Sequence, residues 1–435
     1  MRALALLLLL ASPLALGQDD ASSEDGAAPD AEAAPSDGYV PDSASVSSVQ
    51  VHGYVDVGFA KAQGSSFARG DTRLPADYGV DAFAPAVNSR GDVASLDAEG
   101  RFVNGFLPRS LEIGDRASFF VNTASLDVQY APPGAPVLLF TRAQFMPRFR
   151  PGQGTETRVL LQQAFGRVIP FDFAEFALTV GKFDPVFGIE YLENEAPLRV
   201  NVTPSLMARY TTGHQVGAKA FYRMQFPRLL SALSLNAAVT NNSSRVESLQ
   251  TPEVSLTGRP HGSARLGYEL QLLRLQLKLG ASGQYGPRND QRVAHVLHRA
   301  LGADARITAG WLSLSGEFVR ALDDQGVLPG KETGLGAFPF ASGFHVRGFY
   351  ATAALALPIS ARFALRTVTP FARYDQRNAG FDGFGDIRTS RITAGARLDL
   401  WELVALKAEY LLNREESGAP RVDNDVFTAS AVGSF

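Results

Sequence analysis

The feature that most constrains this chain is a period-two alternation of apolar and polar residues, in segments of about ten residues, throughout its body. In 274–285, the clearest segment, Leu275 and Leu277 alternate with Gln276 and Lys278. Such alternation places successive side chains on opposite faces of a strand, whereas an amphipathic helix needs spacings of three and four. The sequence therefore predicts an all-β chain whose strands each have one apolar and one polar face.

The same reading predicts sixteen strands. Their ranges are 50–60, 116–130, 137–148, 158–168, 176–187, 214–225, 232–242, 261–271, 274–285, 299–308, 311–321, 343–357, 363–376, 389–400, 403–413 and 425–435. Two of them, 158–168 and 363–376, alternate poorly. An even strand number brings both ends of such a chain to the same side of a membrane.

The gaps between these strands alternate in length. The long gaps are 61–115, 149–157, 188–213, 243–260, 286–298, 322–342, 377–388 and 414–424. Short gaps such as 131–136, 272–273 and 309–310 lie between them. Outer-membrane barrels have short periplasmic turns and long external loops. The pattern therefore predicts a transmembrane antiparallel β-barrel of about 16 strands over residues 50–435, in the cell outer membrane.

The N-terminal region predicts export. Arg2 precedes an apolar run that ends at Leu16, too short for the roughly 20 residues of a membrane-spanning helix. We expect residues 1–17 to be a signal peptide cleaved after Gly17; the alternative is an N-terminal helical anchor. Residues 18–49 contain eight acids and no Lys or Arg, which predicts a disordered acidic periplasmic segment, either a spacer or a tether for a cationic or peptidoglycan partner.

Composition agrees with a barrel and narrows the chemistry. Hydrophobic residues make up 45% of the chain, as expected when only one face of each strand meets lipid. There is no cysteine, so disulfides and thiol chemistry are excluded. The net charge is −3 over the whole chain. Because the N-terminal acids account for this excess, the body from residue 50 carries 40 basic and 36 acidic residues and is weakly positive.

The last predicted strand carries an assembly signal. Phe427, Ala429, Ala431 and Gly433 form one apolar face that ends on Phe435, the final residue. A terminal aromatic on an alternating last strand resembles the signal that the barrel-assembly machinery reads. We therefore expect Phe435 to be that signal, the machinery to be a partner, and outer-membrane lipid to contact the apolar faces.

No enzyme, nucleotide or nucleic-acid motif appears, so neither an enzyme activity nor a cofactor is expected. His295 and His298 are three residues apart, but a third metal ligand at a usable spacing is missing. We therefore expect no metal site, and we expect both histidines to lie on the surface of an external loop.

The segment from Gly181 to Glu190 reads Gly-Lys-Phe-Asp-Pro-Val-Phe-Gly-Ile-Glu. It resembles the Gly-(Lys/Gln)-Phe-x-x-x-Phe-Gly-x-Glu segment of the phosphate-selective porin O/P group and related porin-like barrels. The likeness is close over some ten residues and loose over 50–435. It implies a channel through the outer membrane, without carrying phosphate selectivity.

The segment that follows, 188–213, is the third external loop. In general porins this loop folds inward and narrows the pore, so the resemblance implies a constriction here, with packing on the barrel rim as the alternative. The candidate constriction residues are Glu190, Glu193, Glu195, Arg199 and Arg209. Opposed charges across a narrow lumen filter solutes by charge. The longer loop 61–115 is a second candidate for occluding the lumen.

Strand parity predicts which charged side chains line the pore, because charges on the lipid face cost about 2–4 kcal/mol at the midplane. The predicted bases are Lys219, Arg223, Arg265, Arg274, Lys278, Arg306, Arg391, Arg397 and Lys407. The predicted acids are Glu269, Asp304, Glu317, Asp399 and Glu409. Nine bases against five acids predict a weak anion preference.

Together these features predict a porin-like channel for passive diffusion of small hydrophilic solutes or ions. Trimerisation is usual for such porins, although the sequence carries no interface signature. The alternatives are a structural or adhesion barrel, or a barrel enzyme, with a plugged lumen.

Overall fold

The computed structural model describes residues 48–62, 94–96, 102–106, 118–150, 154–171, 175–193, 195–244, 258–287, 297–324, 326–327, 339–340, 344–359, 364–381, 386–417 and 425–435. The predicted signal peptide and most of the predicted acidic segment lie outside the described residues. So does most of the long loop 61–115.

Sixteen long strands form one antiparallel sheet within these residues. They are β1 (Ser48–Ala62), β4 (Ser118–Ala131), β5 (Val137–Arg150), β6 (Gly154–Val168), β7 (Glu175–Phe183), β8 (Gln215–Phe226), β9 (Ser231–Thr240), β10 (His261–Leu272), β11 (Leu275–Pro287), β12 (Leu297–Ala309), β13 (Leu312–Asp323), β16 (Phe344–Leu355), β18 (Leu365–Phe381), β19 (Asp386–Leu400), β20 (Val404–Ser417) and β21 (Val426–Ser434). Each predicted strand corresponds to one of them.

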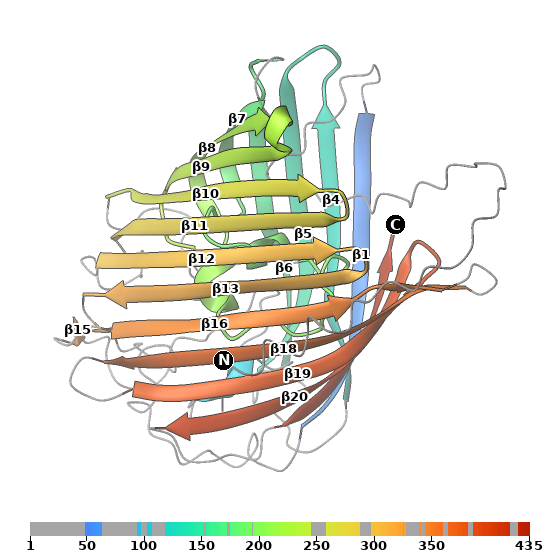
Figure 1. Cartoon of the computed structure of the whole chain (residues 1–435). Coiled ribbons are helices and arrows are strands. Elements are labelled where there is room, and N and C mark those ends of the chain that lie inside the picture. Colours follow the sequence, from blue (N-terminus) through green and yellow to red (C-terminus); the bar gives the residue numbers. More distant parts are fainter. Residues whose placement is uncertain are drawn as a thin grey trace. The chain divides into compact units, whose positions relative to one another are not determined.

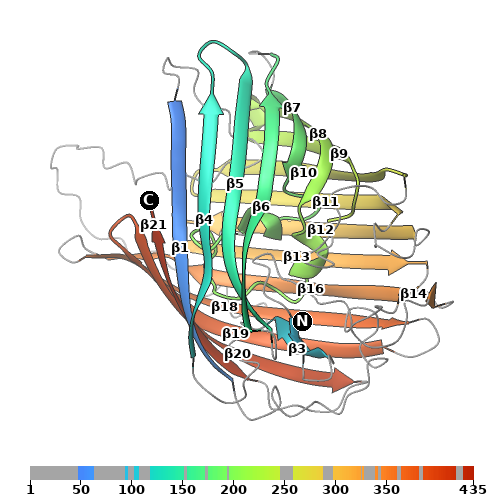
Figure 2. The same ribbon diagram turned by 180° about the vertical axis from the view of Figure 1, so that it is seen from behind.

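The sheet closes on itself. Each long strand pairs with its neighbours along the chain, and β1 pairs with both β4 and β21. Figure 1 shows β10 to β13 and β16 side by side on the near wall, with β1, β4 and β5 on the far wall; Figure 2 shows the reverse. The predicted transmembrane antiparallel barrel is therefore confirmed.

The two faces of each strand are inverted relative to a soluble protein. On β9, Leu233, Leu235 and Val239 face outward and are exposed, whereas Asn236 and Thr240 face inward and are buried. This arrangement repeats around the barrel. An exposed apolar wall of this extent is stable only against hydrocarbon, so the outer face is the lipid-facing surface of an outer-membrane barrel.

Some strands are longer than the alternation predicts. β5 and β6 continue to the Arg150–Gly154 pair, and β18 and β19 continue to the Gly380–Asp386 pair. The predicted gaps 149–157 and 377–388 are therefore too long. Paired strands satisfy their backbone groups beyond the bilayer too, where side-chain alternation no longer reports the fold.

Short elements in or next to the predicted gaps escape prediction. β2 (Ala94–Leu96) pairs with β3 (Phe102–Phe106), β14 (Gly326–Val327) pairs with β15 (Pro339–Phe340), and β17 (Leu357–Pro358) pairs with β18. The helices are short: α1 (Ala208–Thr211) and 3₁₀ turns at Glu190–Glu193 and Pro227–Leu229. No helix among the described residues is long and apolar enough to span a membrane.

The chain end closes the seam between β21 and β1. Phe435 and Gly53 exchange both backbone hydrogen bonds, at 3.0 and 2.9 Å. The Phe435 ring covers Gly53, because a Cβ atom on this glycine would lie 2.4 Å from the ring. The predicted apolar face of the last strand points outward, with Phe427 and Phe435 exposed.

Candidate functional site: the segment inside the barrel

The chain between β7 and β8 enters the lumen. We call residues 184–213 the inner segment; only Asn194 within it lies outside the described residues. Pro185 has no amide hydrogen to continue the ladder after Phe183, so β7 ends four residues before its predicted end. Gly188, with a positive φ of 77°, leaves no room for a side chain beside Glu317 on β13. The segment is thus seated against the inner wall.

Cations on the wall bind carbonyl groups of the inner segment. On β18, Arg373 donates to Thr203 (2.9 Å) and Pro204 (3.0 Å). On β19, Arg391 donates to Pro204 (2.5 Å), and Arg397 donates to Pro197 (2.5 Å) and Arg199 (3.1 Å). On β20, Lys407 donates to Arg199 (2.6 Å) and Ala196. Irregular backbone has no ladder partners of its own, and buried carbonyls need donors. These side chains supply them.

Carboxylates on the wall accept from amide groups of the same segment. Glu317 Oε2 accepts from Ile189 and Glu190 (3.2 Å each), the Glu409 carboxylate from Val202 (2.8 Å) and Thr203 (2.7 Å), and Asp375 Oδ1 from Leu206 (3.2 Å). The basic side chains of the wall thus bind carbonyl oxygens of the inner segment, and the acidic side chains bind its amide N–H groups.

A third contact holds the segment to β1 and β5. The Glu195 carboxylate lies 2.8 Å from Arg142 Nη1 and accepts from Gln144 Nε2 at 3.0 Å and from the Tyr54 hydroxyl. Arg142 also binds Asp127 of β4. On the other side, Glu193 pairs with Arg306 of β12. The segment is thus bound to walls on several sides of the lumen.

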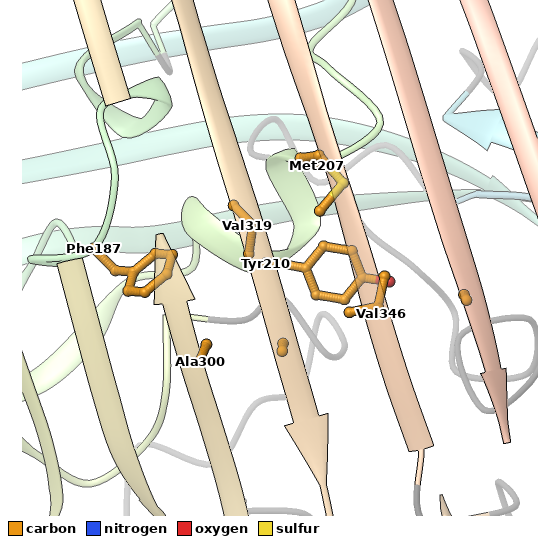
Figure 3. Close-up of a cluster of buried hydrophobic side chains, with 8 residues drawn as sticks. Phe187, Met207, Tyr210, Ala300, Val319 and Val346 are labelled. Carbon is orange, nitrogen blue, oxygen red and sulfur yellow. The ribbon is translucent and has the colours of Figure 1, made fainter. Parts of the chain in front are cut away.

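Apolar packing complements these polar contacts. Figure 3 shows Phe187, Met207 and Tyr210 pointing from the inner segment onto small and branched side chains of the wall, including Ala300, Val319 and Val346. Two wall glycines create the space. A Cβ on Gly302 would lie 2.9 Å from the Phe187 ring, and one on Gly348 would lie 2.5 Å from Met207 Sδ.

A cavity remains between the inner segment and β13, β16, β18 and β19. Its volume is about 200 Å³, and its charged lining consists of Glu190, Glu193, Arg199, Arg373 and Arg397. Burial raises the pKa of Glu190, although hydrogen bonds from Ser205 oppose this shift. Three guanidinium groups thus face two carboxylates in this cavity.

The predicted pore-lining residues fall into two groups. Arg306, Glu317, Arg391, Arg397, Lys407 and Glu409 bind the inner segment, as described above, and Asp399 faces inward and pairs with Arg397. Lys219, Arg223, Arg265, Glu269, Lys278 and Asp304 face inward on β8 and β10 to β12. In this second group Arg265 binds Asp304 at 2.6 Å, and Glu269 lies between Arg223 (2.8 Å) and Lys278 (3.5 Å).

Three expectations need correction or stay open. Arg274 is exposed in the turn between β10 and β11 instead of lining the wall, because β11 begins one residue later than predicted. His298 is not a surface residue: it faces the lumen, 1% exposed, with Nδ1 2.6 Å from Asp323 Oδ1. Arg209 belongs to α1, its side chain lies outside the described residues, and so does His295.

Sequence reasoning missed several residues that hold the inner segment, notably Tyr54, Arg142, Arg373 and Asp375. Arg373 and Asp375 lie in 363–376, where alternation is poor because inward positions include Phe371. The i, i+2 spacing of Arg373 and Asp375, which places both on one face, was the available signal. Among the described residues, no group of three His, Cys, Asp or Glu side chains could hold a metal ion.

The fold is that of known outer-membrane channels and porins. The outer membrane channel DcaP of Acinetobacter baumannii aligns with a TM-score of 0.51 at 9% identity, covering 89% of this chain and 97% of that chain. The anion-selective porin from Comamonas acidovorans aligns with 0.50 at 12% identity, covering 90% and 100%. Salmonella typhi OmpF, in complex with daunomycin, aligns with 0.50 at 12% identity, covering 89% and 98%.

No protein-family model and no curated protein sequence matches the chain. At these identities, the structural likeness shows a porin-type outer-membrane barrel and nothing narrower. It does not confirm the resemblance to the phosphate-selective group.

Proposed function

We propose that the protein is a porin-like channel for passive diffusion of small hydrophilic solutes or ions through the outer membrane. The observation that carries this proposal is the inner segment, which lies across a lumen lined by charged side chains. A barrel of sixteen strands is wide enough to hold water beside such a segment. The inner segment is then the constriction, and Glu190, Glu193, Glu195, Arg199 and Arg209 belong to it.

The accessible charges lie toward the end of the barrel with the short turns. There the side chains of Arg223, Glu269 and Lys278 are 30%, 32% and 41% exposed. Further into the lumen, Lys219 and Asp304 are buried. A vestibule that narrows at the inner segment predicts a small single-channel conductance.

A weak anion preference completes the proposal. Three guanidinium groups against two carboxylates in the cavity beside the inner segment favour anions there. Two of these arginines, Arg373 and Arg397, also pair with Asp375 and Asp399. Most other wall charges, including Arg265 with Asp304, are paired as well, so the preference is expected to be small.

The alternative is a structural or adhesion barrel, or a barrel enzyme, with a plugged lumen. The many hydrogen bonds and ion pairs between the wall and the inner segment favour this alternative. They hold the segment inside the lumen, and each of them would have to persist in an open channel. The absence of enzyme activity remains part of our proposal.

Single-channel recording in a planar bilayer, under a salt gradient, distinguishes these functions. Stepwise conductance with a reversal potential on the anion side is the expected result. A correctly folded barrel without conductance would refute the channel and favour the plugged alternative, for which adhesion and hydrolysis assays follow.

Three further features belong to the same proposal. Residues 1–17 are the signal peptide and 18–49 the acidic periplasmic segment that precedes the barrel. Phe435 is the signal for the barrel-assembly machinery. The protein assembles as a homotrimer, which light scattering in detergent would test.

A further inference from the structure

Three arginines stand on the lipid-facing surface of adjacent strands: Arg299 on β12, Arg320 on β13 and Arg347 on β16. All three are exposed, and they share their outward face with Leu301 and Phe318. Arg320 lies directly opposite Arg347 in the strand register. Like charges at directly opposed positions destabilise an antiparallel pair, so this arrangement is unfavourable unless an anion lies between them.

The chain does not supply that anion within the residues described. None of the three arginines has an ion pair there, whereas the neighbouring rim cations do. Arg388 pairs with Glu416, and Arg414 with Asp425. The three arginines therefore form a cationic cluster on the outer wall that has no counter-charge among the described residues.

The height of the cluster matches a membrane interface. Arg320 follows Leu312, at the short-turn end of β13, by eight residues, which is about 26 Å along a strand. A strand tilt of about 40° reduces this to about 20 Å along the membrane normal, near the outer edge of an apolar band about 25 Å tall. Because arginine side chains are long and carry their charge at the tip, guanidinium groups at this height reach the outer-leaflet headgroups.

An apolar groove runs beside the cluster. It encloses about 910 Å³ on the outer face, and Arg299 and Arg320 belong to its lining. Its floor consists of residues with little or no side chain: Gly262, Ala264 and Gly283. Leu301 lies opposite both Gly283 and Arg320 in the register, so the groove and the cluster are continuous.

We propose that this site binds a phosphate-bearing lipid of the outer leaflet, with the phosphate between Arg299, Arg320 and Arg347 and an acyl chain in the groove. Guanidinium groups recognise phosphate oxygens in bidentate geometry, and the phosphate removes the repulsion between Arg320 and Arg347. A twofold contact between copies through this face would bring the same arginines together and is unfavourable; a contact in another arrangement would appear as a change of oligomeric state in the test below. The site does not depend on solute passing through the lumen.

The test is binding of a diphosphorylated lipid A probe to the full-length protein in zwitterionic micelles, followed by native mass spectrometry. The variant is Arg299→Gln/Arg320→Gln/Arg347→Gln. The matched control, Arg228→Gln/Arg274→Gln/Arg366→Gln, removes three exposed arginines at the short-turn end. Affinity should fall about tenfold or more in the variant and less than twofold in the control. If the triple variant folds poorly, the lipid A affinity of the single variant Arg320→Gln is measured in its place.

The groove is tested separately with Gly283→Leu, which fills its floor. Lipid A binding should weaken, whereas any binding of inorganic phosphate should not change. If millimolar inorganic phosphate displaced the bound probe as effectively as free lipid A does, the cluster would be a site for free anions. That result would overturn the proposal of a lipid ligand. Equal lipid A binding by wild type and the triple variant, or a change of oligomeric state in that variant alone, would overturn the site itself.

Discussion

Lys407→Met is expected to release the inner segment locally without unfolding the barrel. Lys407 is 3% exposed, and its ammonium group donates to the carbonyls of Ala196 and Arg199. Hydrogen bonds to a charged group contribute about 1.5–3 kcal/mol each, so two of them amount to about 3–6 kcal/mol. Lumen water can replace part of this, and we take about 3 kcal/mol as the net loss. That corresponds to about a hundredfold rise in the undocked population.

Cysteine labelling measures this population cleanly, because the native chain has no cysteine. Ala196→Cys introduces one thiol at a position that is 2% exposed and adjacent to the bond in question. The maleimide labelling rate should rise about two orders of magnitude when Lys407→Met is added. Channel records should show longer or larger open states, while the melting temperature of the barrel changes little.

Lys278→Met is the matched control. It removes an inward lysine that pairs with Glu269 and whose side chain is 41% exposed. It should leave the labelling of Cys at position 196 unchanged. Equal labelling rates in the Lys407→Met and Lys278→Met backgrounds would refute the view that the wall cations hold the segment in place.

Three other predictions follow from the same contacts. Gly302→Val should displace Phe187, since even a Cβ atom would lie 2.9 Å from its ring, and conductance should rise or become unstable in single-channel records. Phe435→Ala should lower the yield of folded barrel in outer-membrane fractions by exposing Gly53 at the seam, whereas Phe435→Tyr should preserve it; equal yields would contradict the seam. Lys278→Met should shift the reversal potential toward cations by a few millivolts, and an opposite shift would argue against anion preference.

Much of the wall could be predicted because a barrel strand must present one face to lipid. Parity alone assigned Lys407 and Glu409 to the lumen, and the structure places them there. Their partners could not be predicted, since alternation says nothing about which irregular backbone fills the lumen. His298 was missed for a different reason. Alternation in 297–309 places it inward, but the predicted strand begins at 299, one residue too late to include it.

The inner segment was recognisable only through a resemblance in Gly181–Glu190. That resemblance suggested a loop that folds inward, with no information on its bonds. Gly302 lies opposite Phe187, and Gly348 lies opposite Met207. Both glycines are visible in the sequence, but a glycine in a strand has several explanations, so neither could be assigned to this packing. Complementarity between two segments far apart in sequence is a property of the assembled fold.

The bonds of the inner segment also set an order for assembly. Lys407 lies 211 residues beyond its acceptor Ala196, and Glu409 lies 207 residues beyond Val202. These bonds need both partners in one lumen, so they form only after the strands beside the inner segment and the strands β18 to β20 have all been assembled. The lumen stays hydrated until then, and long-range contacts of this kind form late because loop closure costs entropy before the contacts form. Filling of the interior is therefore a late event of maturation, and barrels arrested before closure should expose residues 184–213 to proteases that the finished barrel resists.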